Sequence, residues 1–176
     1  MTKNKHKKGQ IAGQIFIYIV AAIVIGGIAL VGYKAISSLS TKACQAEKAT
    51  FNNNLEAKIE NGLSSGSVKP EYFKAPCDYE KICFVATSSI NLQSGDTFKC
   101  PENKIIEESV KAHIEQNIFV ISSDRTIPIG YSDIISLNDT YTNTGAQTNC
   151  LCIKQRNHQF YITFKGKEST AEIVQG

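Results

Sequence analysis

The chain carries no charged side chain between Gly9 and Tyr33, although Lys, Arg, Asp and Glu make up 20% of its residues. Roughly two dozen uncharged residues in a helix exceed the ~30 Å thickness of a bilayer's hydrocarbon layer. A helix is the expected conformation, because in lipid it gives every backbone N–H and C=O a partner. A buried helix of a soluble protein is the alternative, but no other segment looks able to cover an apolar rod of this length.

Cysteine is absent before the end of this apolar stretch, and an exported, oxidising location after it would favour disulfides for an even number of cysteines. No two cysteines have the Cys-x-x-Cys spacing, although their grouping leaves zinc or an iron–sulfur cluster as an alternative. Cys150 and Cys152 share one face of a predicted strand and would need different partners. Neither a metal nor another cofactor is expected. The disulfide candidates are Cys44, Cys77, Cys83, Cys100, Cys150 and Cys152.

Catalytic sequence motifs are also lacking. The chain has no zincin or hydrolase motif, no phosphate-binding loop and no dinucleotide-binding glycine motif. The net charge of +3 includes a lysine cluster at the N-terminus, without which the chain is close to neutral. We therefore expect neither enzymatic activity nor a nucleic-acid-binding surface.

The lysine cluster predicts the orientation of the apolar helix. Lysines that flank a spanning segment tend to remain cytoplasmic, and this cluster outweighs the downstream cations Lys34 and Lys42. We expect a cytoplasmic N-terminus and an extracytoplasmic C-terminal region, with removal of the whole segment disfavoured because secretory signals have shorter apolar regions. A lipoprotein cleavage box before Cys44 is disfavoured by Lys42. The cluster consists of Lys3, Lys5, Lys7 and Lys8.

The junction Lys7-Lys8-Gly9-Gln10 followed by an apolar helix resembles the class III signal peptide of archaeal type IV pilin-like proteins. The resemblance covers roughly the first third of the chain. It implies that a prepilin-type signal peptidase cuts after Gly9, so that Gln10 begins a mature chain that retains its apolar segment. Many relatives carry glutamate at the fifth mature position, where this chain has Gln14, so an assembly step that needs that carboxylate is not implied.

Small residues form a stripe along the apolar helix. Their spacings of four and three place them on one side, where another helix can approach closely in lipid. Alternatively, the stripe reflects only the general abundance of glycine and alanine in membrane helices. Partners expected for this segment are the bilayer and like or related pilin subunits. The predicted helix-packing residues are Gln14, Ala22, Gly26, Ala29 and Gly32.

The helical pattern is expected to continue beyond the membrane over residues 34–62, which contain no proline. Phe51, Leu55 and Ile59 repeat every four residues, with Leu63 next, and predict an apolar ridge that a head domain covers. Serines at positions 37, 38 and 40 leave a break near the membrane surface open. Gly62 is the expected end of the helix.

Residues 63–176 predict a mainly antiparallel β head that contains the cysteines. Residues 68–76 are expected to form a loop because of Pro70 and Pro76, residues 104–116 a short helix, and residues 156–158 the turn of a hairpin. The polar residues 138–149 predict an exposed loop in which Asn138 is a glycosylation candidate. Strands are predicted at 81–86, 118–122, 127–129, 134–137, 150–154, 159–164 and 169–174.

The expected fold is therefore α+β and pilin-like. It comprises a basic leader (1–9), a membrane and assembly helix (10–33), its amphipathic continuation (34–62) and a β-rich head (63–176). The first functional hypothesis is a pilin-like subunit of a surface filament or pseudopilus. The alternative is an unpolymerised, single-pass surface protein whose head binds a ligand or partner.

Overall fold

A computed structural model describes residues 7–61, 66–90, 98, 100, 103–123, 125–137 and 150–176, with the burial of side chains described from Gln14 onward. The chain divides into two compact units, Met1–Gln45 and Ala46–Gly176. The division falls within one helix, so the helix contributes its first part to one unit and its last part to the other. Each unit is described separately below.

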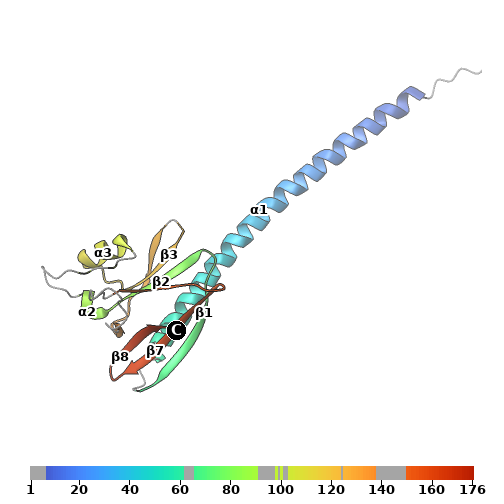
Figure 1. Cartoon of the computed structure of the whole chain (residues 1–176). Coiled ribbons are helices and arrows are strands. Elements are labelled where there is room, and N and C mark those ends of the chain that lie inside the picture. The colour runs from blue at the N-terminus through green and yellow to red at the C-terminus, as the bar shows by residue number, and fades with distance from the viewer. Residues whose placement is uncertain are drawn as a thin grey trace, which may run out of the picture. The chain divides into compact units, whose positions relative to one another are not determined.

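The first element is the helix α1, which runs from Lys7 to Asn61 (Figure 1). The absence of proline allows the backbone hydrogen bonds to continue through the whole of this range. The break considered around the serines does not occur. Thr41 instead donates its hydroxyl to the carbonyl oxygen of Ser37 at 3.1 Å, so the side-chain donor is satisfied within the helix. The expected stop at Gly62 and the ridge residue Leu63 lie outside the described residues.

The unit Ala46–Gly176 contains two four-stranded sheets. The first, sheet A, has the order β1 (Val68–Lys74), β7 (Gln159–Lys167), β8 (Thr170–Gln175) and β5 (Ile135–Leu137). Its pairs are antiparallel except for β5 and β8, which run parallel. The second, sheet B, is antiparallel throughout, with the order β4 (Thr126–Gly130), β3 (Ile118–Ser122), β2 (Tyr79–Val85) and β6 (Cys150–Lys154). The expected mainly antiparallel head is confirmed.

The loop predicted at residues 68–76 is wrong for most of its length. Val68–Lys74 forms β1, which pairs along its whole length with β7. Pro70 is tolerated because β1 is an edge strand of sheet A, and an edge strand needs ladder hydrogen bonds on one side only. A proline is therefore a weak argument against a strand when the strand's place in the sheet is unknown.

The turn at residues 156–158 is confirmed, but the strands on either side of it do not form a hairpin. Asn157 and His158 have φ values of 52° and 57°, as a two-residue turn of the hairpin type requires, and Arg156 bridges to Gln159. Beyond that bridge, β6 joins β2 in sheet B and β7 joins sheet A. The turn therefore passes the chain from one sheet to the other.

Two short helices complete the unit: α2 (Thr87–Ile90), which was not predicted, and α3 (Lys104–Lys111). Asn103 caps α3 by accepting a hydrogen bond from the backbone N–H of Ile105 at 2.9 Å. The helix predicted to reach Gln116 is too long, because His113 has a φ of 53° and the chain leaves the helical conformation there. Ile114, which lies beyond the end of α3, is 47% exposed.

The main core joins α1 to the inner faces of both sheets. Phe51, Leu55 and Ile59 are each at most 4% exposed, which confirms the predicted ridge. The ring of Phe51 packs against the rings of Phe73 and Phe160 of sheet A, with centroids 6.0 and 5.8 Å away, and against Tyr79 of sheet B at 5.7 Å. The last four turns of α1 therefore provide apolar side chains to a core that they share with both sheets.

A second core lies on the other face of sheet B. Ile106 and Val110 of α3 pack there with Phe98 and with Phe119 of β3. Cys83, Cys100, Cys150 and Cys152 belong to the same layer. The alternation of side chains along a strand explains the separation of the two cores, since Ile82 and Phe84 of β2 face α1 while Cys83 and Val85 face α3.

Two ion pairs connect the start of the head's helical segment to the last residue of β1 and to the turn that follows it. Lys48 lies 2.8 Å from Asp78 and Lys74 lies 2.7 Å from Glu47. The hydrogen bond from Lys74, together with its charge, lowers the pKa of Glu47 below its ordinary value of 4.5, and the hydrogen bond from Lys48 lowers the pKa of Asp78 below 3.8.

We predict that the contribution of these two ion pairs to the stability of the head is lost on acidification below about pH 4.5. A lowered carboxyl pKa contributes stability that is present above the unfolded-state pKa and is lost as the pH falls through the folded-state pKa. Thermal unfolding of the detergent-solubilised protein at successive pH values measures this. The Lys48→Met, Lys74→Met double variant should show a shallower decline below pH 4.5. An equally steep decline in the variant would contradict the assignment to these two pairs.

Candidate functional site

In the first unit, residues 14–33 of α1 present an apolar surface that no other described residue covers. Within α1, the segment from Gln14 contains one stretch that is long and apolar enough to cross a membrane, with a mean hydropathy of 2.7 over its most apolar window and none of that window buried. Phe16, Ile23 and Leu30 are each about 68% exposed, and the first charged residue after Gln14 is Lys34. From Gln14 to Tyr33 the helix measures about 30 Å, which is the thickness of a bilayer's hydrocarbon layer.

The predicted helix-packing residues occupy one side of this surface. At 100° per residue, Ala22, Gly26 and Ala29 lie within about 60° of one another. Gln14 and Gly32 are about five helical turns apart, so they point in the same direction, at the edge of this side of the helix. A side chain added at Gly26 or Gly32 would meet nothing within 4 Å. This side of the helix is therefore open, and it combines small residues with one amide that can form hydrogen bonds.

Two other sequence predictions, the processing residues and the glycosylation candidate, concern side chains outside the described set. Gly9 and Gln10 lie within α1, and their side chains are outside the described set. Asn138 lies outside the described residues. His113 and His158 are exposed residues with positive φ, one after the end of α3 and the other in the turn before β7.

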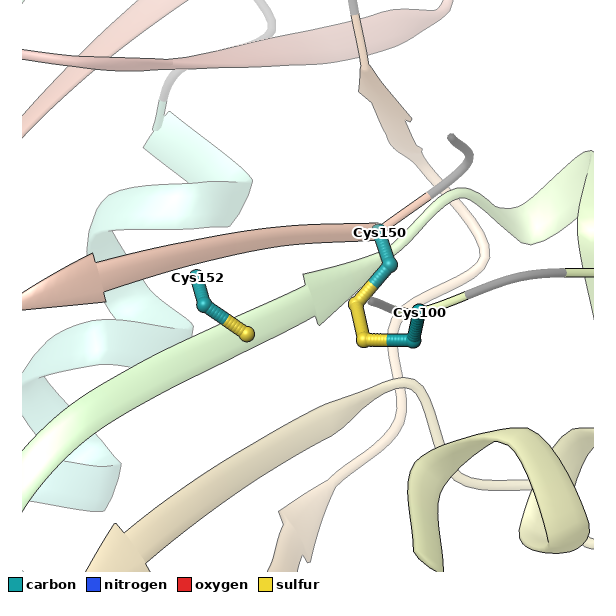
Figure 2. Close-up of side chains that lie close together, drawn as sticks. All are labelled: Cys100, Cys150 and Cys152. Carbon is teal, nitrogen blue, oxygen red and sulfur yellow. A yellow bond between two sulfur atoms is a disulfide. The ribbon is translucent and has the colours of Figure 1, made fainter. Parts of the chain in front are cut away.

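Two disulfides lie next to each other between sheet B and α3. Cys83 of β2 is directly opposite Cys152 of β6 in the ladder, and the two are bonded. Cys100 is bonded to Cys150, which lies two residues before Cys152 on the same strand (Figure 2). Cys150 and Cys152 thus take different partners, as their shared strand face requires. Cys44 and Cys77 are also disulfide-bonded.

The sulfur atoms of Cys100, Cys150 and Cys152 lie within 4.8 Å of one another, a distance at which thiolates could hold a metal ion (Figure 2). Bonded as disulfides, however, these sulfurs are not thiolates, and thiolates are what zinc and iron–sulfur clusters require. The cysteine layer is therefore structural in this form. It links Cys100 to the edge strand β6, and β6 to the neighbouring strand β2.

No sequence pattern predicted the groove that the structure places in the head, between α1 and residues 129–134. It has a volume of about 460 Å³. Asn52, Glu56 and Glu60 line one side, and residues 129–134 line the other. Ile129 and Ile134, which are half-buried, line it together with the fully buried Leu55 and Ile59.

The buried side chain of Asn117 fixes the backbone of Ser132, which lines the groove. Asn117 is fully buried, and its amide oxygen accepts a hydrogen bond from the Ser132 N–H at 2.8 Å. Its amide nitrogen donates to the Ser132 carbonyl oxygen at 2.6 Å, and Thr87 donates its hydroxyl to the same oxygen at 3.1 Å. A backbone segment fixed by three hydrogen bonds is preorganised, so the groove exists before anything binds.

The groove is acidic at its rim. Glu56, Glu60 and Asp133 are exposed and line it, and none of them forms an ion pair within the part of the chain that the structure describes. Glu56 and Glu60 are one turn apart on α1, so their like charges repel each other. The spacing of these two glutamates was visible in the sequence, but their proximity to Asp133 depends on tertiary folding.

Comparisons of the chain with protein-family models, with curated proteins and with solved structures give no match.

Proposed function

We propose that the protein is a pilin-like structural subunit, anchored in the cell membrane by α1 and assembled through that helix into a surface filament or pseudopilus. The observation that supports it best is the long helix itself. Its apolar part has no covering within the described chain, and its last turns are built into a disulfide-containing β head. An exposed apolar surface of this size requires lipid, other helices, or both.

The orientation follows from two features of the chain. The lysines before the apolar segment favour a cytoplasmic N-terminus. The disulfides of the head favour an oxidising compartment on the other side of the membrane. Both features agree with a single-pass protein whose head is extracytoplasmic.

Processing at the N-terminus tests the proposal most directly. We expect the protein isolated from its native membrane to begin at Gln10, because the junction before the apolar segment resembles a class III cleavage site. Intact mass and N-terminal sequencing measure this. A mature chain that still begins at Met1 would contradict the pilin-like assignment. If the chain is processed, electron microscopy of sheared surface material would show whether it is polymerised or monomeric.

We predict that Gly26→Leu weakens association between apolar helices by about tenfold, whereas Gly27→Leu changes it little. The two glycines are adjacent, but about 100° apart around the helix, and only Gly26 belongs to the small-residue side. Both have open space around them in the isolated chain, so neither leucine disturbs the protein's own packing. Cross-linking or energy transfer between labelled copies in bilayers measures association. Equal effects of the two substitutions would contradict a specific helix contact.

The alternative, an unpolymerised surface protein whose head binds a partner, is favoured by a different observation, namely the preorganised groove of the head. The two candidates differ in polymerisation and not in binding, since a filament subunit can also present a binding site on its head.

A further inference from the structure

We propose that the groove between α1 and residues 129–134 binds a short, extended peptide segment that combines apolar side chains with lysine or arginine. This inference is independent of the proposed function, because it concerns only the head and requires no contact between apolar helices.

The dimensions of the groove favour a peptide. The lining runs along α1 from Asn52 to Glu60, a length of about 12 Å, which matches about four residues of extended chain. Both sides of the groove carry exposed residues, Glu56 and Glu60 on one and Tyr131 and Asp133 on the other. It is therefore an open trough into which side chains of a passing chain can reach.

The chemistry of the lining specifies the side chains. Ile129 and Ile134, which are only half-buried, provide accessible apolar surface to the lining, and Tyr131, which is 45% exposed, adds an aromatic ring. Burial of aliphatic side chains against this surface is favourable. The rim carboxylates form no ion pair with described residues, so a cation would relieve their mutual repulsion and gain charge-assisted hydrogen bonds. A segment that combines apolar side chains with lysine or arginine therefore complements both the apolar lining and the acidic rim.

Addition of the peptide as an extra strand of sheet B is the less suitable mode of binding. β4 is an edge strand of sheet B and borders the groove, but Pro128 in its middle has no N–H to donate. Recognition therefore depends on side chains, and it should respond to changes of charge at the rim.

The test uses the full-length protein in a non-ionic detergent, labelled at the isoleucine δ1 methyl groups for nuclear magnetic resonance. The probe is the peptide acetyl-Leu-Lys-Leu-Lys-amide, and the comparison peptide is acetyl-Leu-Glu-Leu-Glu-amide. We expect the lysine peptide to shift the methyl signals of Ile129 and Ile134 with a Kd of about 0.1 to 1 mM, and the glutamate peptide to bind at least tenfold more weakly.

Charge reversal at the rim provides the decisive variant. In Glu56→Lys, Asp133→Lys, both changed residues are exposed, so the fold should persist, and the preference should invert in favour of the glutamate peptide. The matched control is Glu108→Lys, Glu115→Lys, which changes the net charge equally at exposed positions outside the groove lining. It should leave the preference for the lysine peptide intact.

Three results would overturn the proposal. The first is an unchanged preference in the rim variant. The second is a set of shifts confined to isoleucines of the apolar helix, which would show that the peptide binds the detergent-covered segment. The third is a shift of Ile129 and Ile134 that depends on protein concentration without peptide, which would identify a second copy of the chain as the occupant.

Discussion

Replacing Ile23 and Ile25 by lysine should abolish stable membrane insertion of the full chain. Both residues lie near the middle of the uncharged segment and are 69% and 68% exposed. A lysine at the centre of a spanning helix costs about 2.5 to 3.5 kcal/mol in insertion, so two should cost about 6 kcal/mol. Fractionation of cells followed by alkaline extraction of the membranes measures the loss.

The matched control is Ile23→Ala, Ile25→Ala, which shortens the same side chains without adding charge and should leave the protein in the membrane. The lysine variant also separates the two interpretations of the apolar segment. If the segment were instead a buried helix of a soluble protein, the unmodified protein would already be in the soluble fraction and the lysines would release nothing from the membrane. An unchanged distribution between membrane and soluble fractions would therefore refute membrane anchoring.

The helix could be predicted because two independent sequence patterns cover its two parts. The uncharged stretch defines its first part, and the spacing of Phe51, Leu55 and Ile59 defines its last part. Strands with a strong β-branched or aromatic pattern were predicted closely as well: β3 and β6 have the expected bounds, Ile118–Ser122 and Cys150–Lys154. Local patterns succeed where the local preference and the tertiary environment agree.

The errors in the head arise where tertiary context overrides a local signal. Pro70 suggested a loop, yet an edge position in sheet A accommodates it within β1. The turn at Asn157 and His158 has the local form of a hairpin turn, but it connects two different sheets. Neither the place of a strand in its sheet nor the sheet to which it belongs is encoded in a window of a few residues.

The groove could not have been predicted for a related reason. Its two sides come from residues 52–60 and 129–134, which are far apart in the chain. Asn117, which fixes one side, lies in neither segment and is an ordinary polar residue by sequence. By contrast, the open side of the apolar helix was predictable, since Ala22, Gly26 and Ala29 lie on a single element whose geometry follows from its own sequence.

Removing both disulfides of the cysteine layer should unfold the head. Cys83–Cys152 and Cys100–Cys150 close sequence separations of 69 and 50 residues, and the second loop lies inside the first. Loop-closure entropy assigns about 4 kcal/mol to either bridge alone. When one bridge is present, the other closes a shorter path of about 20 residues and contributes about 3 kcal/mol. Loss of both should cost about 7 kcal/mol, comparable with the whole stability of a domain.

The variants that test this are Cys83→Ala, Cys152→Ala and Cys100→Ala, Cys150→Ala, separately and combined. Alanine avoids placing a hydroxyl in the layer that Phe98 and Phe119 share with the sulfurs. Denaturant unfolding followed by circular dichroism measures the free energy of each. Chemical reduction of the unmodified protein, which also breaks the disulfide bonds of Cys44 and Cys77, provides a comparison in which no sulfur is lost.

Each pairwise variant should remain folded, and the combined variant should lose more stability than the sum of the two losses. That excess arises because one loop lies inside the other. When the first bridge is removed, the remaining bridge still restricts the unfolded chain, whereas removal of the second bridge leaves no such restriction from this layer. Strictly additive losses would mean that the bridges act through local packing beneath α3 and not through the chain entropy of the unfolded state.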